Sequence, residues 1–394
     1  MRRPAIQRSH GLVCSRVTHG QTVRRERMTG VNKGTYGAGG WAKGTEVVIG
    51  LDLSDRVSTW EAVDRHGVRA SGKVEMTREA VREAFAGMER ALVVMEAGTH
   101  TLWVAKVLRE IGHDVHTVDA RELVRARGMR KTDKRDAERL MSLGWDIVHG
   151  KPVARVRERT IEQQGELALV RGRDALVRAR GRLISTVRGL VKPLGERVGK
   201  HTADSFVRFA REELSPQVLT MAAPLLAAIE KLTAEIDEME KLVAAMLAQK
   251  PDAQLLQQVN GVATVTASVF MVTIGDPQRF ARSRDVPAYL GLVPLVSQSG
   301  AHDPQMRISK AGDALCRRIL VQAANYILGP FGKDCALRRW GLKLAGEGTN
   351  PSRKKRAVIA VARKLAVLLH RLWVSGTAYD PMRGLSPEPV PAVA

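Results

Sequence analysis

The sequence predicts three folded parts: an α/β domain over residues 46–150, an α-helical coiled-coil region over 151–250, and a mainly α-helical domain over 251–378. Three observations support this division of the 394-residue chain. Short apolar runs alternate with amphipathic helical stretches in the first part. The second part has helical periods alone and ends at Pro251. In the third part, apolar helices are joined by glycine-containing turns and polar loops.

The order of elements in the first part defines its expected fold. Three strands come first, at 47–52, 59–64 and 68–74. They are followed by helix 77–90, strand 91–96, helix 102–110, strand 113–118 and helices from about 120 to 143. Three antiparallel strands followed by parallel strands with crossover helices is the order of the ribonuclease-H-like fold. This fold is the prediction for the N-terminal domain.

Four carboxylates occupy positions at which this fold would bring them together. Asp52 and Glu96 end the first and fourth strands, which are neighbours in such a sheet. Asp133 and Asp136 are three residues apart, so a helix would place both on one face. Oxygen ligands select Mg²⁺ or Mn²⁺ over zinc, and two such ions can assist displacement at phosphorus. One acid alone would more often be a solvated surface group, but the four together predict a metal site. The candidate phosphate contacts beside them are Lys131, Lys134 and Arg135.

The charge balance indicates a polyanionic partner. The chain has 63 Lys and Arg against 41 Asp and Glu, a net charge of +22, which points most simply to DNA or RNA. A membrane surface is the competing polyanion, but no apolar run approaches the length of a spanning helix. Three scattered cysteines are too few for a disulfide framework or a zinc cluster, which fits a reducing cytoplasm.

The two ends of the chain are predicted to lie outside the folded parts. Residues 1–45 contain nine Lys and Arg, one Glu and no hydrophobic period, which is typical of a disordered basic arm. Residues 379–394 are Pro-rich and are predicted to be a disordered tail.

The helical region combines an arginine-rich stretch with a heptad pattern. Nine Arg between 155 and 188 favour a nucleic-acid contact over a solvated helical face. The candidate contacts are Arg171, Arg173, Arg178 and Arg180. Apolar residues from Leu225 to Met246 recur at alternating spacings of 4 and 3, which predicts a coiled-coil seam. An antiparallel helix pair within one chain would show the same spacing. Self-association as a dimer or tetramer is favoured, because the intervening positions are rich in Glu and Lys.

The C-terminal domain contains further candidate contacts to a phosphate backbone. Two apolar helices flank the tight turn Asn260-Gly261, as in a helix-hairpin-helix that presents backbone N–H groups to a phosphate. An Asn-Gly pair between helices is also often only a turn. A polar loop at 297–304 precedes a basic segment and a long helix, and a second basic cluster at 353–356 precedes the last helix. The candidate contacts are Gly261, Arg307, Lys310, Arg317 and Arg318.

Two sets of motifs resemble the IS110 family of transposases, from about residue 46 to 373. The first set is the family's DEDD pattern, in Ile49-Gly50-Leu51-Asp52, Met95-Glu96 and Lys131-Thr132-Asp133-Lys134-Arg135-Asp136-Ala137. The second set is Tyr289-Leu290-Gly291-Leu292-Val293-Pro294, Gln298-Ser299-Gly300 and Arg307-Ile308-Ser309-Lys310-Ala311-Gly312. The resemblance implies a RuvC-like domain that binds metal ions through the four acids. It also implies a C-terminal domain with a nucleophilic serine, which the motif places at Ser299.

The resemblance further implies a site-specific recombinase that moves an insertion element on the bacterial nucleoid. DNA is then the substrate, and a structured non-coding RNA from the element is the guide, bound partly by the basic helices. The sequence departs from the family pattern at 303–306, where a Gly before Arg307 is usual, and at Asn260, where Pro is commoner. Ser297 and Ser309 compete with Ser299 for the role of nucleophile. Two alternatives remain. One is a RuvC-like nuclease or junction resolvase that uses water as the nucleophile, and the other is a nucleic-acid-binding protein without catalysis.

Overall fold

The computed structural model describes residues 24–27, 47–119, 132–295, 306–346 and 350–383. The chain divides into two compact units, Met1–Ile161 and Glu162–Ala394. Residues just after the predicted boundary at 150 belong to the first unit, because Val156 N donates to Thr117 O at 2.8 Å and Arg155 forms a bridge with Val118. The predicted helical region and C-terminal domain lie together in the second unit.

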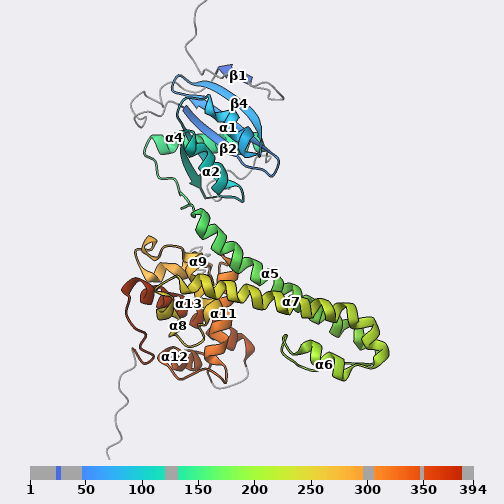
Figure 1. Ribbon diagram of the computed structural model, residues 1–394. Coiled ribbons are helices and arrows are strands. Elements are labelled where there is room, and N and C mark those ends of the chain that lie inside the picture. The colour runs from blue at the N-terminus through green and yellow to red at the C-terminus, as the bar shows by residue number, and fades with distance from the viewer. Residues whose placement is uncertain (1–23, 28–46, 120–131, 296–305, 347–349, 384–394) are drawn as a thin grey trace, which may run out of the picture. The chain divides into compact units, whose positions relative to one another are not determined.

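The first unit contains a six-stranded sheet of order β1-β4-β3-β2-β5-β6 (Figure 1). The strands are β1 Arg24–Arg27, β2 Val47–Asp52, β3 Val57–Asp64, β4 Val68–Glu75, β5 Ala91–Glu96 and β6 Asp114–Val118. β2, β3 and β4 are antiparallel neighbours, whereas β5 and β6 extend the sheet in parallel with β2. This order is consistent with the predicted ribonuclease-H-like fold. β1 lies within the predicted disordered arm and pairs with β4, so the prediction of disorder is wrong for these four residues.

Three helices cover the two faces of this sheet: α1 Arg78–Ala86, α2 Thr101–Glu110 and α4 Asp133–Val148. Alternate residues of a strand point to opposite faces. Ile49 and Leu51 therefore pack in one core with residues of α1 and α2, and Val48 packs in another core with α4. Burial on both faces explains why β2 and β5 are continuous apolar runs. The predicted last helix of this domain, at about 120–143, is observed as α4, which ends later, and residues 120–131 lie outside the described part.

The second unit is mainly helical (Figure 1). Its α-helices are α5 Ile161–Val191, α6 Phe206–Glu213, α7 Pro216–Ala248, α8 Ala253–Gln257, α9 Thr264–Ile274, α10 Val286–Tyr289, α11 Ala314–Leu328, α12 Ala336–Ala345 and α13 Pro351–Ser375. One core joins the start of α5 and the end of α7 to α8–α13, and a second joins the other ends of α5 and α7 to α6. No described helix is both long enough and apolar enough to cross a bilayer.

The heptad seam of α7 packs against α5 of the same chain. Ile229, Ile236 and Val243, one in every seven residues, are buried. The pairing runs antiparallel, because Arg173 bonds to Glu240 whereas Arg180, further along α5, bonds to the earlier Thr233 of α7. An intramolecular helix pair, the reading that the sequence analysis favoured less, therefore accounts for the seam. Self-association stays a prediction.

Candidate functional site

Helix α4 lies directly on β2 because β2 has a glycine at the crossing point. A Cβ placed on Gly50 would overlap the backbone of Ala137 and Met141. Further along α4, a Cβ on Gly144 would likewise collide with the side chain of Val48, two residues before Gly50. Two glycines, one on each element, thus allow the helix and strand backbones to approach closely. This contact fixes the first turn of α4 over the carboxyl end of β2.

The four predicted acids lie at this edge of the sheet. β2 and β5 are parallel neighbours with Leu51 opposite Met95, so Asp52 and Glu96 follow at adjacent strand ends. Asp52 is two residues beyond Gly50, and therefore points to the face that α4 covers. Glu96 is opposite Val118, whose side chain packs with α4, and so points to the same face. Asp133 and Asp136 are in the first turn of α4. The structure therefore places all four acids on one side of the sheet.

Local hydrogen bonds position the segments that carry these acids. The Thr132 side chain accepts from Arg135 N at 3.4 Å and caps α4. Two acids in the first turn also interact favourably with the helix dipole. Beyond β5, Thr101 Oγ1 donates to Glu96 O at 2.9 Å and accepts from Gly98 N at 2.7 Å, which holds the strand end. Asp52, Glu96 and Asp136 are half-buried and Asp133 is exposed.

The donor set of this face suits a hard divalent cation, because it consists of carboxylate oxygens. Among the described residues, no three His, Cys, Asp or Glu side chains are gathered closely enough to form a ready metal site. The four acids thus have the chemistry that such an ion requires and share one side of the sheet, but in this arrangement they are not gathered around a common point. A further carboxylate that the sequence analysis did not select lies on the same face: Glu61 of β3 is opposite Gly50 and only 4% exposed. Its position inside an apolar strand was the signal available in the sequence.

In the second unit, backbone hydrogen bonds join the two C-terminal motifs, 289–295 and 307–312, which precede and follow residues 296–305. The two joined segments are called the ribbon below. Leu295 N donates to Arg307 O at 2.9 Å, and Ser309 N donates to Val293 O at 2.8 Å. Lys310 N donates to Gly291 O at 3.1 Å. Ser299 and its competitor Ser297 lie between these anchors but outside the described residues.

Glycine is required at two points of this ribbon. Gly291 and Gly312 have φ values of 69° and 72°, and a Cβ on either would overlap the backbone of the opposite motif. Among the described residues, Lys310, with φ 55°, is the one non-glycine residue in the left-handed region. Ser309 Oγ accepts from Ala311 N at 3.4 Å, which gives this competing serine a role in the ribbon. The glycines of the two C-terminal motifs are thus explained by the direct packing of one motif's backbone against the other's.

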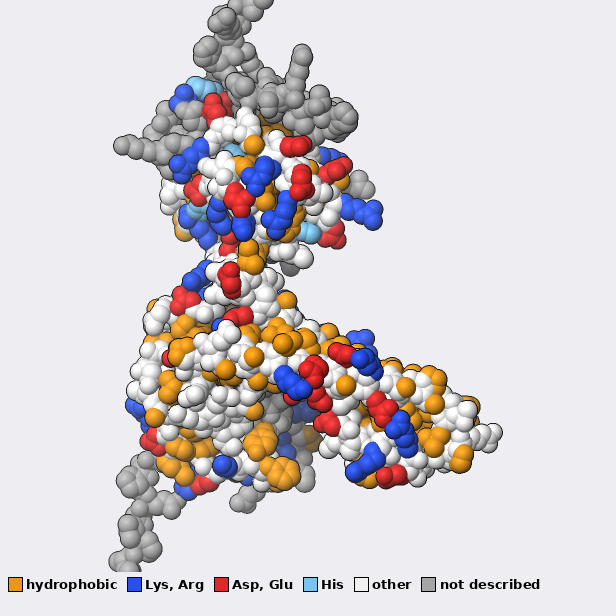
Figure 2. All heavy atoms as spheres, viewed as in Figure 1, with side chains coloured by type: hydrophobic (Ala, Val, Ile, Leu, Met, Phe, Trp, Pro, Cys, Tyr) orange, Lys and Arg blue, Asp and Glu red, His pale blue; other side chains and the backbone are white. Residues whose placement is uncertain are grey.

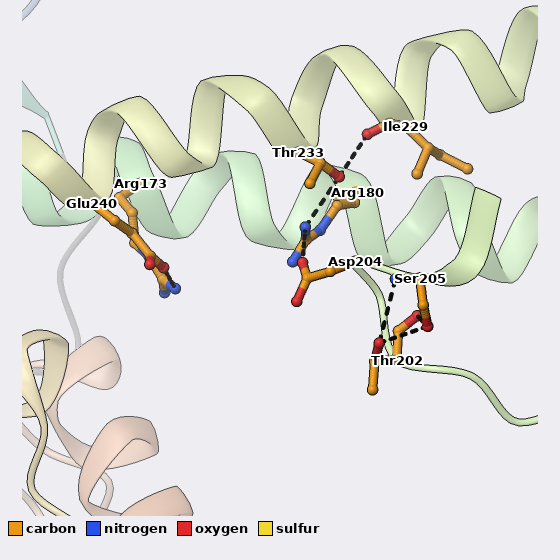
Figure 3. A network of polar contacts seen from close by, with 8 residues as sticks. All are labelled: Arg173, Arg180, Thr202, Asp204, Ser205, Ile229, Thr233 and Glu240. Carbon is orange, nitrogen blue, oxygen red and sulfur yellow. Dashed lines mark hydrogen bonds and ion pairs between the residues drawn. The ribbon is translucent and has the colours of Figure 1, made fainter. Parts of the chain in front are cut away.

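Several arginines that were predicted to contact nucleic acid instead form bonds within the second unit (Figure 3). Arg180 is 7% exposed and donates to Asp204 Oδ1 at 2.6 Å, so the prediction of a nucleic-acid contact is wrong for it. Arg173 pairs with Glu240 of α7. Arg178 and Arg318 share Asp174. These side chains stabilise the helix packing.

The remaining predicted contacts differ in their surroundings. Arg171 pairs with Asp313 at 2.9 Å while half exposed, and Arg317 donates to two carbonyl oxygens, Leu290 O at 3.0 Å and Ala311 O at 2.9 Å. Lys134, Arg135, Arg307 and Lys310 are exposed, as are the ion-paired Arg171 and Arg178. Lys131 lies outside the described residues.

The Asn-Gly turn between α8 and α9 is confirmed. Gly261 has φ 81°, a conformation that favours glycine, and a Cβ there would lie 3.1 Å from Ala323 O of α11. Asn260 Nδ2 donates to Lys333 O at 3.3 Å. The turn is therefore packed against α11, and phosphate binding by its N–H groups stays a prediction.

Comparison with known proteins gives matches over both units. Residues 49–194 match the IS110-type DEDD model described as "Transposase", and residues 253–331 match the model described as "Transposase IS116/IS110/IS902 family". A probable family 20 transposase of Pseudomonas aeruginosa is 29% identical over 343 residues, covering 84% of this chain and 98% of that protein.

Two further relatives are transposases of insertion elements. The transposase for element IS1328 of Yersinia enterocolitica is 29% identical over 71% of this chain and 83% of its own length. The transposase for element IS1111A of Coxiella burnetii is 26% identical over 84% and 91%. The matched segments contain the acids on the sheet and the glycine-locked ribbon, and the relatives align along most of their length. The chain therefore belongs to the IS110 family of insertion-element transposases.

Proposed function

We propose that this transposase cuts and rejoins DNA at the ends of its element with Ser299 as the nucleophile. Asp52, Glu96, Asp133 and Asp136 would hold Mg²⁺ or Mn²⁺ in this reaction. The observation that supports the proposal is that the four acids lie on one side of the sheet. Strand pairing sets the positions of Asp52 and Glu96, and the first turn of α4 contains Asp133 and Asp136. Carboxylates contribute nothing to simple polyanion binding, so the presence of four of them on one side of the sheet argues for chemistry.

The proposed reaction is a transesterification. The Ser299 hydroxyl attacks the scissile phosphorus, a bond from its Oγ to phosphorus forms, and the bond to the deoxyribose oxygen breaks. The serine proton is lost to a base, and the leaving deoxyribose oxygen takes up a proton. When bound, divalent ions polarise the phosphate and stabilise the charge that develops on the oxygens. The protein–DNA phosphoester keeps the bond energy, so the reverse attack rejoins DNA without ATP.

The proposal includes three kinds of partner. DNA of the element ends and of the target is the substrate, and exposed Lys134 and Arg135 beside the acids would contact its phosphates. A non-coding RNA of the element would select the target, which accords with the net charge of +22. A homo-oligomer, dimer or tetramer, would bring two DNA ends together.

The test is incubation of the protein with element DNA, the flanking RNA and Mg²⁺, followed by denaturing electrophoresis. We expect a protein–DNA adduct that maps to Ser299. Ser299→Ala should abolish the adduct and cleavage, whereas the matched variant Ser297→Ala should keep both. Asp136→Ala should abolish cleavage while it leaves salt-sensitive DNA binding nearly unchanged. Cleavage that persists in Ser299→Ala without an adduct would instead identify a nuclease that uses water.

A further inference from the structure

The positive charge of the second unit is concentrated on α12 and α13. These two helices contain ten Lys and Arg and no Asp or Glu. Nine of the ten are exposed, the exception being the half-buried Arg338. Within the described part of the chain, Arg339 with Asp334 is the one ion pair that this set makes. Apart from that pair, no acid of the described residues forms an ion pair with these cations.

The arginine-rich α5 shows the opposite situation. It carries six Arg against three acids, and its partner α7 carries two Lys against five acids, so the pair has no net charge. Figure 2 shows basic and acidic side chains next to one another along α7. Arginine density in the sequence thus overstates the attraction of α5 for a polyanion, because acids from α7 balance it. The uncompensated charge lies on α12 and α13.

A pocket opens between α11, α12 and α13, with a volume of about 790 Å³. Its lining includes the apolar Leu328, Leu342 and Val358, together with Lys343 and Lys354 from two different helices. This volume is in the range of ligand sites. Apolar side chains beside cations suit a planar nucleobase together with the phosphate that follows it.

We propose that the α12–α13 face binds an unpaired nucleic-acid strand, with phosphates on its lysines and arginines and one base in this pocket. The strand must be unpaired, because a base within a duplex is stacked and cannot enter a pocket in the protein. A duplex would use the charges alone. The proposal takes nucleic acid as the ligand class from the proposed function, but it does not depend on the cleavage chemistry. The shared chemistry, a phosphodiester strand with free bases, is offered by both DNA and RNA.

Binding is measured by fluorescence anisotropy with the full chain, without divalent cations, on mixed-sequence single-stranded DNA, single-stranded RNA and duplex DNA of equal length. We expect at least one single strand to bind more tightly than the duplex, and the better of the two identifies the strand. Lys343→Gln with Lys354→Gln should weaken this binding about tenfold and lower the salt slope by roughly 1.4, about 0.7 for each phosphate contact. The matched double variant Arg182→Gln with Lys200→Gln removes two exposed charges elsewhere and should have little effect.

A variant of the pocket wall separates base binding from charge. Leu342→Ser should weaken single-strand binding at every salt concentration without a change in slope, because it removes apolar contact only. The proposal is overturned if the two double variants weaken binding equally, if neither weakens it, or if the duplex binds as tightly as the single strands. Equal competition by polyglutamate would also overturn it, since that result requires charge alone. Cleavage that persists in Ser299→Ala, together with intact strand binding, would refute the proposed nucleophile and leave this inference standing, so the two proposals fail separately.

Discussion

The contact between Gly50 and α4 gives a sharp prediction for Gly50→Ala. The added Cβ would overlap backbone atoms of Ala137 and Met141, whereas ordinary contact begins at 3.4 Å, so α4 must move away by more than 1 Å. Backbone atoms cannot rotate aside as a side-chain end can. Overpacking of this kind costs about 1–3 kcal/mol, and we expect roughly 2 kcal/mol here, a factor of about 30 in the open population. The same movement displaces Asp133 and Asp136, so cleavage should fall more than stability does.

Amide hydrogen exchange followed by mass spectrometry measures this loss locally, in peptides from β2 and α4. Exchange there should accelerate about 30-fold in Gly50→Ala, with little change in peptides of the second unit. The control is Gly98→Ala in the same domain, where a new Cβ meets no atom closer than 3.8 Å. Exchange of β2 at the wild-type rate in Gly50→Ala would show that the helix does not rest on the strand backbone, and the argument for the position of the acids would fail.

Two further predictions concern buried polar groups. Burial lowers the pKa of His113, whose Nδ1 accepts from Ala91 N at 3.1 Å. The unfolded chain therefore binds a proton more readily, and the first unit should lose stability as the pH falls below about 6.5. Thermal unfolding at pH 7.5 and 5.5 should show this loss, and His113→Gln should reduce it; an equal loss in the variant would contradict the assignment. In the second unit, Asp204→Asn should lower the free energy of unfolding by about 1–3 kcal/mol, because it leaves the buried Arg180 cation poorly compensated. Arg180→Met should cost less, since Asp204 is mostly exposed and remains solvated. Urea denaturation followed by circular dichroism measures both variants, and a larger loss in Arg180→Met would contradict this reasoning.

Much of the first unit could be predicted from its sequence because the signals are local. The central strands β2 and β5 are each an apolar run, and the acids that end them are visible as the last residues of those runs. Once the strand order is known, the alternation of side chains assigns Asp52 and Glu96 to one face. β1 could not be found this way. Its sequence is Arg-Arg-Glu-Arg, without an apolar residue, and it becomes a strand only by pairing with β4.

The second unit was harder to predict because its electrostatics depend on contacts distant in the sequence. Arg173 and Glu240 are 67 residues apart, and nothing local indicates that they form a pair. The heptad seam had a similar limitation, because its spacing is the same whether the partner helix is in the same chain or in another. Conversely, the absence of acids from α12 and α13 is readable in the sequence. Its meaning emerged only when the charges on α5 were seen to be balanced.

The packing of Gly291 against Ala311 and of Gly312 against Tyr289 joins the two C-terminal motifs through residues outside 296–305. Hydrogen bonds between 291–295 and 307–310 add to this contact, and the residues that make them also lie outside 296–305. Exchange of residues between 296 and 305 would therefore leave these hydrogen bonds and both glycine positions unchanged. Such an arrangement lets evolution alter the residues between the two motifs, where the proposed nucleophile lies, while the motifs keep their own packing.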